Sequence, residues 1–174
     1  MFKTRILTET AIFIAIGVIG STFLAISFGP YRALFIQHLL NVIIAVFYGT
    51  QRAVTVSFTV ALLRNLLGIG TLFAFPGGMI GACFAGLCYR MKPSIYAAAL
   101  GEVIGTGLIA AIVSRQISQL LTGELLPLFF FVPGFLISSA TGALIAILLY
   151  VKKGALLQRV FKRAPTAHIN ARNE

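Results

Sequence analysis

The sequence predicts an all-α integral membrane protein, a bundle of six transmembrane helices with both termini in the cytoplasm. Hydrophobic residues make up 59% of the 174 residues and charged residues only 10%, with a mean hydropathy of +0.98. A soluble domain carries about 25% charged residues, so this chain cannot cover itself with polar groups. The apolar residues gather in runs, and most of the bases lie at the ends of those runs.

The apolar runs provide six segments that can cross a membrane, since a spanning helix needs about 20 mostly apolar residues. They are predicted at residues 7–28, 34–49, 53–67, 77–91, 94–114 and 127–151. Lys3 and Arg5 precede the first run, as in a secretory signal, but the run is longer than a signal core. We therefore expect a transmembrane domain at residues 1–151 that keeps this segment, followed by a basic cytoplasmic tail at residues 152–174.

The net charge of +10 is explained by membrane topology. Cytoplasmic loops carry the excess of Lys and Arg, and with both termini inside, every base except Arg32, Arg64 and Arg115 falls on the inner side. A strongly basic chain can indicate nucleic-acid binding. Here the basic residues follow the predicted cytoplasmic loops and do not form one patch, which excludes that interpretation. The tail either contacts anionic lipid or is solvated.

Several catalytic motifs are absent from the sequence. It has no Gly-Lys-Ser/Thr phosphate loop, no HExxH metal motif and no GxSxG nucleophile motif. Cys83 and Cys88 lie in one apolar run without CxxC spacing. We therefore expect no catalytic residue, cofactor or metal, and we expect that the chain is not an enzyme. Active transport by this chain would require partner proteins that hydrolyse ATP.

Polar residues inside the apolar runs are the candidate binding residues, because a central Arg or Asp costs about 2.5–3.5 kcal/mol on insertion scales. His38 and Asn41 are three apart in the second span and share a helix face. Glu102 and Thr106 are four apart in the fifth span and also share a face. A pocket that opens outward would collect His38 and Asn41 together with Arg64 and Asn65 of the third span, whereas Glu102 lies nearer the inner end of its span and would form the pocket floor. The residues predicted to line it are His38, Asn41, Arg64, Asn65, Glu102, Thr106 and Ser138.

Structural roles for the same residues stay open from the sequence. Glu102 either contacts a ligand or neutralises Arg64 in a buried pair that holds the helices in register. His38 either lines the pocket or packs in the core, and the other uncharged polar residues either line it or join neighbouring helices. Rows of small residues in the fourth span, among them Gly78 and Gly81, predict close helix packing. The apolar loop at residues 68–76 either closes over the pocket or dips into the lipid interface.

Four stretches resemble the substrate-binding S components of energy-coupling factor (ECF) vitamin transporters, and more narrowly their ThiW group. The stretches are "FGPYRALFIQHLLNVI", "LLRNLLGIGTLFAFPGGMIGA", "GEVIGTG" and "VPGFLISSATGA", which cover most of residues 29–143. The resemblance implies a protein that binds its substrate from outside, docks on a transmembrane coupling protein bearing two ATPases, and topples so that the pocket faces the cytosol. It also implies a thiamine precursor as substrate, with hydroxyethylthiazole as the expected one.

The resemblance also implies a docking face and a location. In the wider family an Ala-xxx-Ala pattern in the first helix meets the coupling protein, and here Ala11 and Ala15 supply that pattern. The expected location is the cell membrane of a prokaryote. A small heteroaromatic alcohol needs a slot of rings and a few polar anchors, and the rings expected to cover it are Phe73, Phe75 or Phe129.

Three alternatives predict different behaviour. An S component for another small vitamin or precursor would differ only in its ligand. An intramembrane enzyme would use Glu102 and His38 as acid and base, and would turn over its substrate without an ATPase partner. A passive channel or oligomeric scaffold would pass its solute without ATP and without saturable binding.

Overall fold

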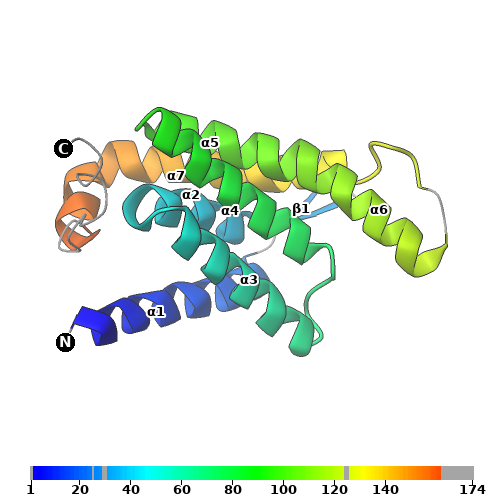
Figure 1. Cartoon of the computed structure of the whole chain (residues 1–174), viewed down its shortest axis with the longest axis horizontal. Helices are drawn as coiled ribbons and strands as arrows, with labels where there is room; N and C mark the ends of the chain where they lie inside the picture. The colour runs from blue at the N-terminus through cyan, green and yellow to red at the C-terminus, as the bar shows by residue number, and fades with distance from the viewer. Residues whose placement is uncertain (1, 25, 29–30, 124–125, 162–174) are drawn as a thin grey trace, which may run out of the picture.

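The computed structural model describes residues 2–24, 26–28, 31–123 and 126–161 (Figure 1). The chain order is α1 (Phe2–Phe23), β1 (Ile26–Phe28), β2 (Tyr31–Ala33), α2 (Phe35–Tyr48), α3 (Thr50–Leu66), α4 (Ala74–Met91), α5 (Ile95–Ile104), η1 (Gly105–Ala110), α6 (Ala111–Thr122) and α7 (Val132–Phe161). The π-helical segment η1 joins α5 to α6 without a break, so residues 95–122 form one helical stretch. The described chain is therefore helical apart from one short hairpin.

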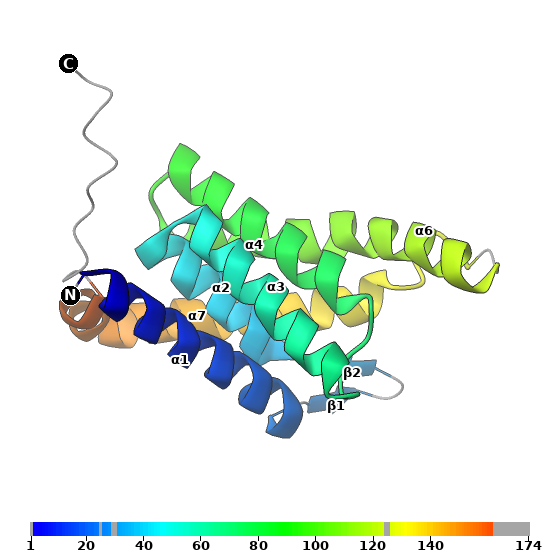
Figure 2. The same cartoon turned by 60° about the horizontal axis from the view of Figure 1, so that its bottom comes forward.

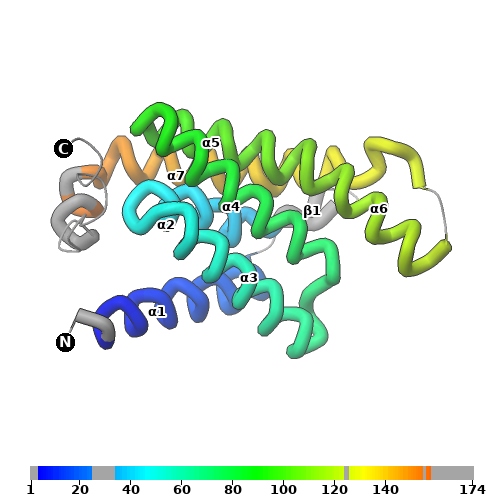
Figure 3. Tube along the Cα trace, in the orientation of Figure 1, coloured from blue at the N-terminus to red at the C-terminus, as the bar shows by residue number. Residues whose placement is uncertain are grey.

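Helix α2 lies at the centre of the bundle, where it packs against α1, α3, α4, α5 and α7. Helix α1 packs on α2 and α3 and forms one side of the molecule in both views (Figures 1 and 2). The tube in Figure 3 shows α6 extending past the ends of α3 and α4. Helix α1 begins and α7 ends at the same end of the bundle (Figure 1).

Two apolar clusters on opposite sides of α2 form the core. Ile44 belongs to the cluster that includes Phe13 of α1 and Val60 of α3. Val42 belongs to the cluster that includes Ala98 of α5 and Ala146 of α7. The alanines at these crossings bring helix backbones close together, which is how helices pack inside membranes.

Long apolar helices with apolar outer surfaces point to a membrane protein. Three helical stretches, Thr4–Phe23, Ile95–Thr122 and Val132–Gly154, are long and apolar enough to cross a membrane, and Phe35–Tyr48 is a shorter apolar helix. Large apolar side chains are exposed on the surface, while polar side chains are buried inside. This distribution fits a chain whose surface faces lipid.

The first predicted span is wrong at its end, because α1 stops at Phe23 and a hairpin follows. Strand β1 pairs antiparallel with β2, with Ile26 opposite Ala33 and Phe28 opposite Tyr31. The sequence between the strands is Gly-Pro, a turn signal. The prediction of an all-α chain therefore holds except for this hairpin.

The last two helices differ from the prediction in length. The fifth extends to Thr122, eight residues past the predicted end, and stops at Gly123, whose φ of 73° is the left-handed conformation that ends many helices. Arg115, predicted in an outer loop, lies in α6, where its Nε donates to Leu126 O at 2.8 Å. Helix α7 continues past residue 151 to Phe161, with non-helical φ and ψ at Lys153. The rest of the predicted tail, residues 162–174, lies outside the described residues.

Candidate functional site

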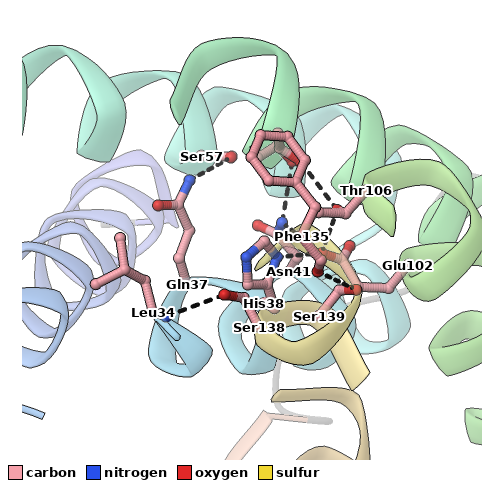
Figure 4. A network of polar contacts seen from close by, with 12 residues as sticks. Leu34, Gln37, His38, Asn41, Ser57, Glu102, Thr106, Phe135, Ser138 and Ser139 are labelled. Atoms are coloured by element: carbon pink, nitrogen blue, oxygen red, sulfur yellow. Dashed lines mark hydrogen bonds and ion pairs between the residues drawn. The ribbon is translucent and has the colours of Figure 1, made fainter. Parts of the chain in front are cut away.

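A buried polar cluster lies between α2, α4, α5 and η1, with the fully buried carboxylate of Glu102 at its centre (Figure 4). His38 Nδ1 lies 2.7 Å from Glu102 Oε1. The Asn41 amide donates to the same oxygen at 3.2 Å, and the Thr106 hydroxyl lies 3.0 Å from it. We name these four residues the Glu102 cluster. The structure therefore brings together the two residue pairs that helix spacing predicted.

The π-helical segment η1 places Thr106 in the cluster. Gly105 and Gly107 flank Thr106, and glycine weakens the ordinary helical pattern. A side chain at Gly105 would collide with α4, because its Cβ would lie 2.8 Å from Phe84 Cβ. Short π-helical segments occur frequently at functional sites. The glycines thus allow η1 to lie against α4, with the Thr106 hydroxyl next to the carboxylate.

Helix α4 contributes backbone acceptors and space to the cluster. Gly77 O accepts from the Thr106 hydroxyl at 2.9 Å, and Gly78 O accepts from the Asn41 amide at 3.0 Å. A Cβ at Gly81 would lie 2.6 and 2.7 Å from the two carboxylate oxygens of Glu102. The small residues of α4 therefore make room for buried polar side chains, as well as for neighbouring helices.

One of the two carboxylate oxygens of Glu102 accepts no hydrogen bond from the described residues. Gly78 O can only accept, so the Asn41 atom that faces both Gly78 and Glu102 must be the amide nitrogen. Glu102 Oε2 is buried and has no hydrogen-bond partner among the described residues. An unpaired buried polar atom is costly and rare in native proteins, so Oε2 is the acceptor of the cluster that a further donor would satisfy.

A second polar group adjoins the first through α2. Arg64 is only 4% exposed, and its Nη1 donates to Gln37 Oε1 at 3.2 Å. Gln37 Nε2 donates in turn to Ser57 Oγ at 3.3 Å. Within the described chain, the basic side chain that lies within 4.0 Å of Glu102 is that of His38. The alternative in which Glu102 pairs with Arg64 is therefore not found, and Arg64 donates to Gln37 instead.

Asn65 and Ser138 lie outside the Glu102 cluster and make backbone contacts. Asn65 Nδ2 donates to Ala61 O at 2.8 Å and to Thr71 O at 3.0 Å, which holds the turn after α3. Ser138 Oγ accepts from Leu34 N at 3.3 Å, which ties α7 to the start of α2. Contact of either residue with a ligand stays a prediction.

A group of phenylalanine rings adjoins the cluster. The ring centroids of Phe73 and Phe131 are 4.7 Å apart, and those of Phe131 and Phe135 are 6.0 Å apart. A Cβ at Gly77, whose carbonyl bonds to Thr106, would lie 3.3 Å from the Phe135 ring. Of the other rings predicted to cover a ligand, Phe75 packs on Phe58 and Phe129 is 62% exposed.

Some residues of the site were missed by sequence reasoning, although signals for them exist. Ser57 precedes Arg64 by seven residues, so both lie on one face of α3. Phe135 precedes Ser138, one of the predicted pocket residues, by three residues, so both lie on one face of α7. For Phe131, just before α7, the sequence offers only its place in the run "LFFF".

The predicted docking residues lie on the outer face of α1. Ala11 and Ala15 are exposed, whereas Phe13 and Gly17 face the bundle and are buried. Ala15 also lines a shallow apolar groove. The other residues of this groove are Ile12, Ile16, Ile19, Gly20, Leu24 and Ile36. The position leaves both alanines accessible to another protein, and docking there stays a prediction.

Comparison with known families assigns the chain to one of them. The model of the ThiW family, described as thiamine-precursor transporter protein, matches residues 7–155. A search of curated proteins and a search of solved structures find no match. The matched range contains all of the Glu102 cluster and the helices that hold it. The chain therefore belongs to the ThiW family of thiamine-precursor transporter proteins.

Proposed function

We propose that this protein is the substrate-binding S component of an ECF-type transporter, which captures hydroxyethylthiazole from outside for ATP-driven uptake. The observation that carries the proposal is the Glu102 cluster. A member of a thiamine-precursor transporter family buries a carboxylate between apolar helices and leaves its Oε2 without a partner among the described residues. Buried ionisable groups in membrane proteins mark substrate sites, so this cluster is the place where the precursor binds.

The proposed topology has six crossings with both termini in the cytoplasm of a prokaryotic cell. Helix α1 begins and α7 ends at one end of the bundle (Figure 1). Exposed basic residues at helix ends support a cytoplasmic location for this end of the bundle, because Lys and Arg are enriched on the cytoplasmic side of membrane proteins. These bases are Arg90, Lys92, Lys152 and Lys153.

This topology places the cluster in the outer half of α4. Gly77 and Gly81 lie three and seven residues into that helix, which corresponds to depths of about 5 and 10 Å. Glu102 is linked to Gly77 through the Thr106 hydroxyl, and its carboxylate packs directly against Gly81. A ligand arriving from outside would therefore reach Glu102 from the outer ends of α2 and α4.

The chemistry of the cluster suits a small heteroaromatic alcohol. Glu102 Oε2 can accept a hydrogen bond from a hydroxyl group. The neighbouring rings of Phe73, Phe131 and Phe135 provide an apolar wall against which a thiazole ring can stack. A few polar anchors beside an apolar wall are the usual composition of a small-molecule site.

Energy for uptake comes from partners in this proposal. The sequence contains no phosphate-binding loop, so a coupling protein with two ATPases would supply ATP hydrolysis. Ala11 and Ala15 on the open face of α1 are the proposed contact with the coupling protein. The chain itself acts as a binding protein and carries out no reaction.

Uptake of radiolabelled hydroxyethylthiazole tests the proposal. We expect accumulation in cells that produce this chain together with an ECF coupling protein and its two ATPases, and none in cells that produce the chain alone. ATPase variants that bind ATP without hydrolysing it should also abolish accumulation. Entry of the thiazole without active ATPases would contradict the proposal and would favour a passive channel.

A further inference from the structure

We propose that His38 contacts the ligand ring through its Nε2–H group, and that Glu102, besides accepting from the ligand hydroxyl, positions the His38 ring. The site would then select a neutral ring whose nitrogen has a free lone pair, and would reject the same ring once that nitrogen is alkylated. The inference rests on the proposed function and adds to it a rule of substrate choice.

The geometry leaves one nitrogen of His38 for a ligand. Nδ1 is occupied by Glu102 Oε1 at 2.7 Å, and within the described part of the chain Nε2 has no hydrogen-bond partner. The His38 side chain is 9% exposed, whereas that of Glu102 is 0% exposed. Of the two side chains, His38 is therefore the one that reaches accessible space.

The charge of the pair decides which hydrogen-bonding role Nε2 takes. Among the described residues, no lysine or arginine lies within 4.0 Å of the Glu102 carboxylate. A single uncompensated charge is expensive in an apolar interior, so His38 and Glu102 together should be neutral. Two proton arrangements satisfy this condition, namely imidazolium with carboxylate and imidazole with carboxylic acid.

Both neutral arrangements put a hydrogen on Nε2. In the imidazolium form, both ring nitrogens carry hydrogens. In the other form, the carboxylic acid donates to Nδ1, so the one hydrogen of the neutral ring must be on Nε2. His38 therefore donates from Nε2 wherever the bridging proton lies, and the group that it binds must be an acceptor.

A donor at this position distinguishes a free thiazole from the finished vitamin. The ring nitrogen of hydroxyethylthiazole has a lone pair that can accept from Nε2–H. In thiamine the same nitrogen is alkylated and the ring is positively charged, so it has no lone pair to offer. The site should thus take the precursor and reject the thiazolium.

Calorimetric titration of the purified full chain with two probes tests the rule. The probes are hydroxyethylthiazole and its N-methyl thiazolium salt, which keeps the hydroxyl group and the ring. We expect N-methylation to weaken binding by at least about tenfold, because it removes an acceptor and leaves a donor unpaired. Equal or tighter binding of the thiazolium salt would overturn the inference and leave the S-component proposal standing. Absence of binding by both probes would overturn the substrate assignment and this inference together.

Two His38 variants separate ligand contact from a structural role. His38→Asn can still donate to Glu102 from the position of Nδ1 but has no group at the position of Nε2. His38→Gln extends an amide N–H toward the position of Nε2. The preference for the neutral ring is the Kd of the thiazolium salt divided by the Kd of hydroxyethylthiazole. We expect this ratio to fall to about one in His38→Asn and to stay above one, but below the wild-type value, in His38→Gln. A preference that stays at the wild-type value in His38→Asn would contradict direct contact, and thermal unfolding in detergent verifies that both variants fold.

Discussion

Replacing Glu102 with alanine is expected to weaken hydroxyethylthiazole binding by about 10–100-fold and to lower the free energy of unfolding by about 1–3 kcal/mol. The binding loss follows because Oε2 and the contact that orients His38 both disappear. The stability loss stays moderate because Asn41 and Thr106 keep their bonds to Gly78 O and Gly77 O. Calorimetry and denaturant unfolding in detergent measure the two quantities.

Two further variants make this result specific. Arg64→Ala should also weaken binding, because Arg64 holds Gln37 next to His38. Glu9→Ala is the matched control, since Glu9 pairs with Arg5 and Arg52 and lies outside the Glu102 cluster. We expect wild-type affinity for Glu9→Ala. Unchanged affinity in both Glu102→Ala and Arg64→Ala would show that the ligand binds elsewhere.

Substituting leucine for both Ala11 and Ala15 is expected to abolish ATP-dependent uptake while leaving ligand affinity unchanged. Both alanines are exposed on α1, so larger side chains there do not disturb the bundle. They would, however, hold a docking helix away from the α1 backbone, because close helix contacts in membranes depend on small residues. Uptake in cells and calorimetry on the purified variant measure the two effects.

The control for this pair is Ala140→Leu, which places a leucine on an exposed position of α7. Uptake by this variant should match that of the wild type. Wild-type uptake by the double variant of Ala11 and Ala15 would place the docking face on another surface of the bundle.

The helices were predictable where apolar runs end abruptly at polar or helix-breaking residues. The second span was predicted at residues 34–49 and α2 covers Phe35–Tyr48, because Gly49 ends the run. The fifth span was cut short at residue 114, because "SRQISQ" is polar although it continues the helix to Thr122. The hairpin was missed because strands of three residues are too short to show an alternating pattern.

The candidate site was predictable within each helix but not between helices. Spacings of three and four residues correctly paired His38 with Asn41 and Glu102 with Thr106. The same spacings say nothing about which faces of different helices meet, so the sequence left Arg64 open as the partner of Glu102. The role of Gly81 was hidden for the same reason, since its missing side chain matters only because the carboxylate lies against it.

The most direct test of the account is a calorimetric titration of the purified protein in detergent with hydroxyethylthiazole, thiamine and hydroxymethylpyrimidine. A binding protein for the thiazole precursor should show saturable binding of hydroxyethylthiazole, with no comparable binding of the other two ligands. Saturable binding of thiamine or of the pyrimidine in its place would contradict the substrate assignment. Absence of saturable binding by all three ligands would contradict the claim that the Glu102 cluster captures a thiamine precursor.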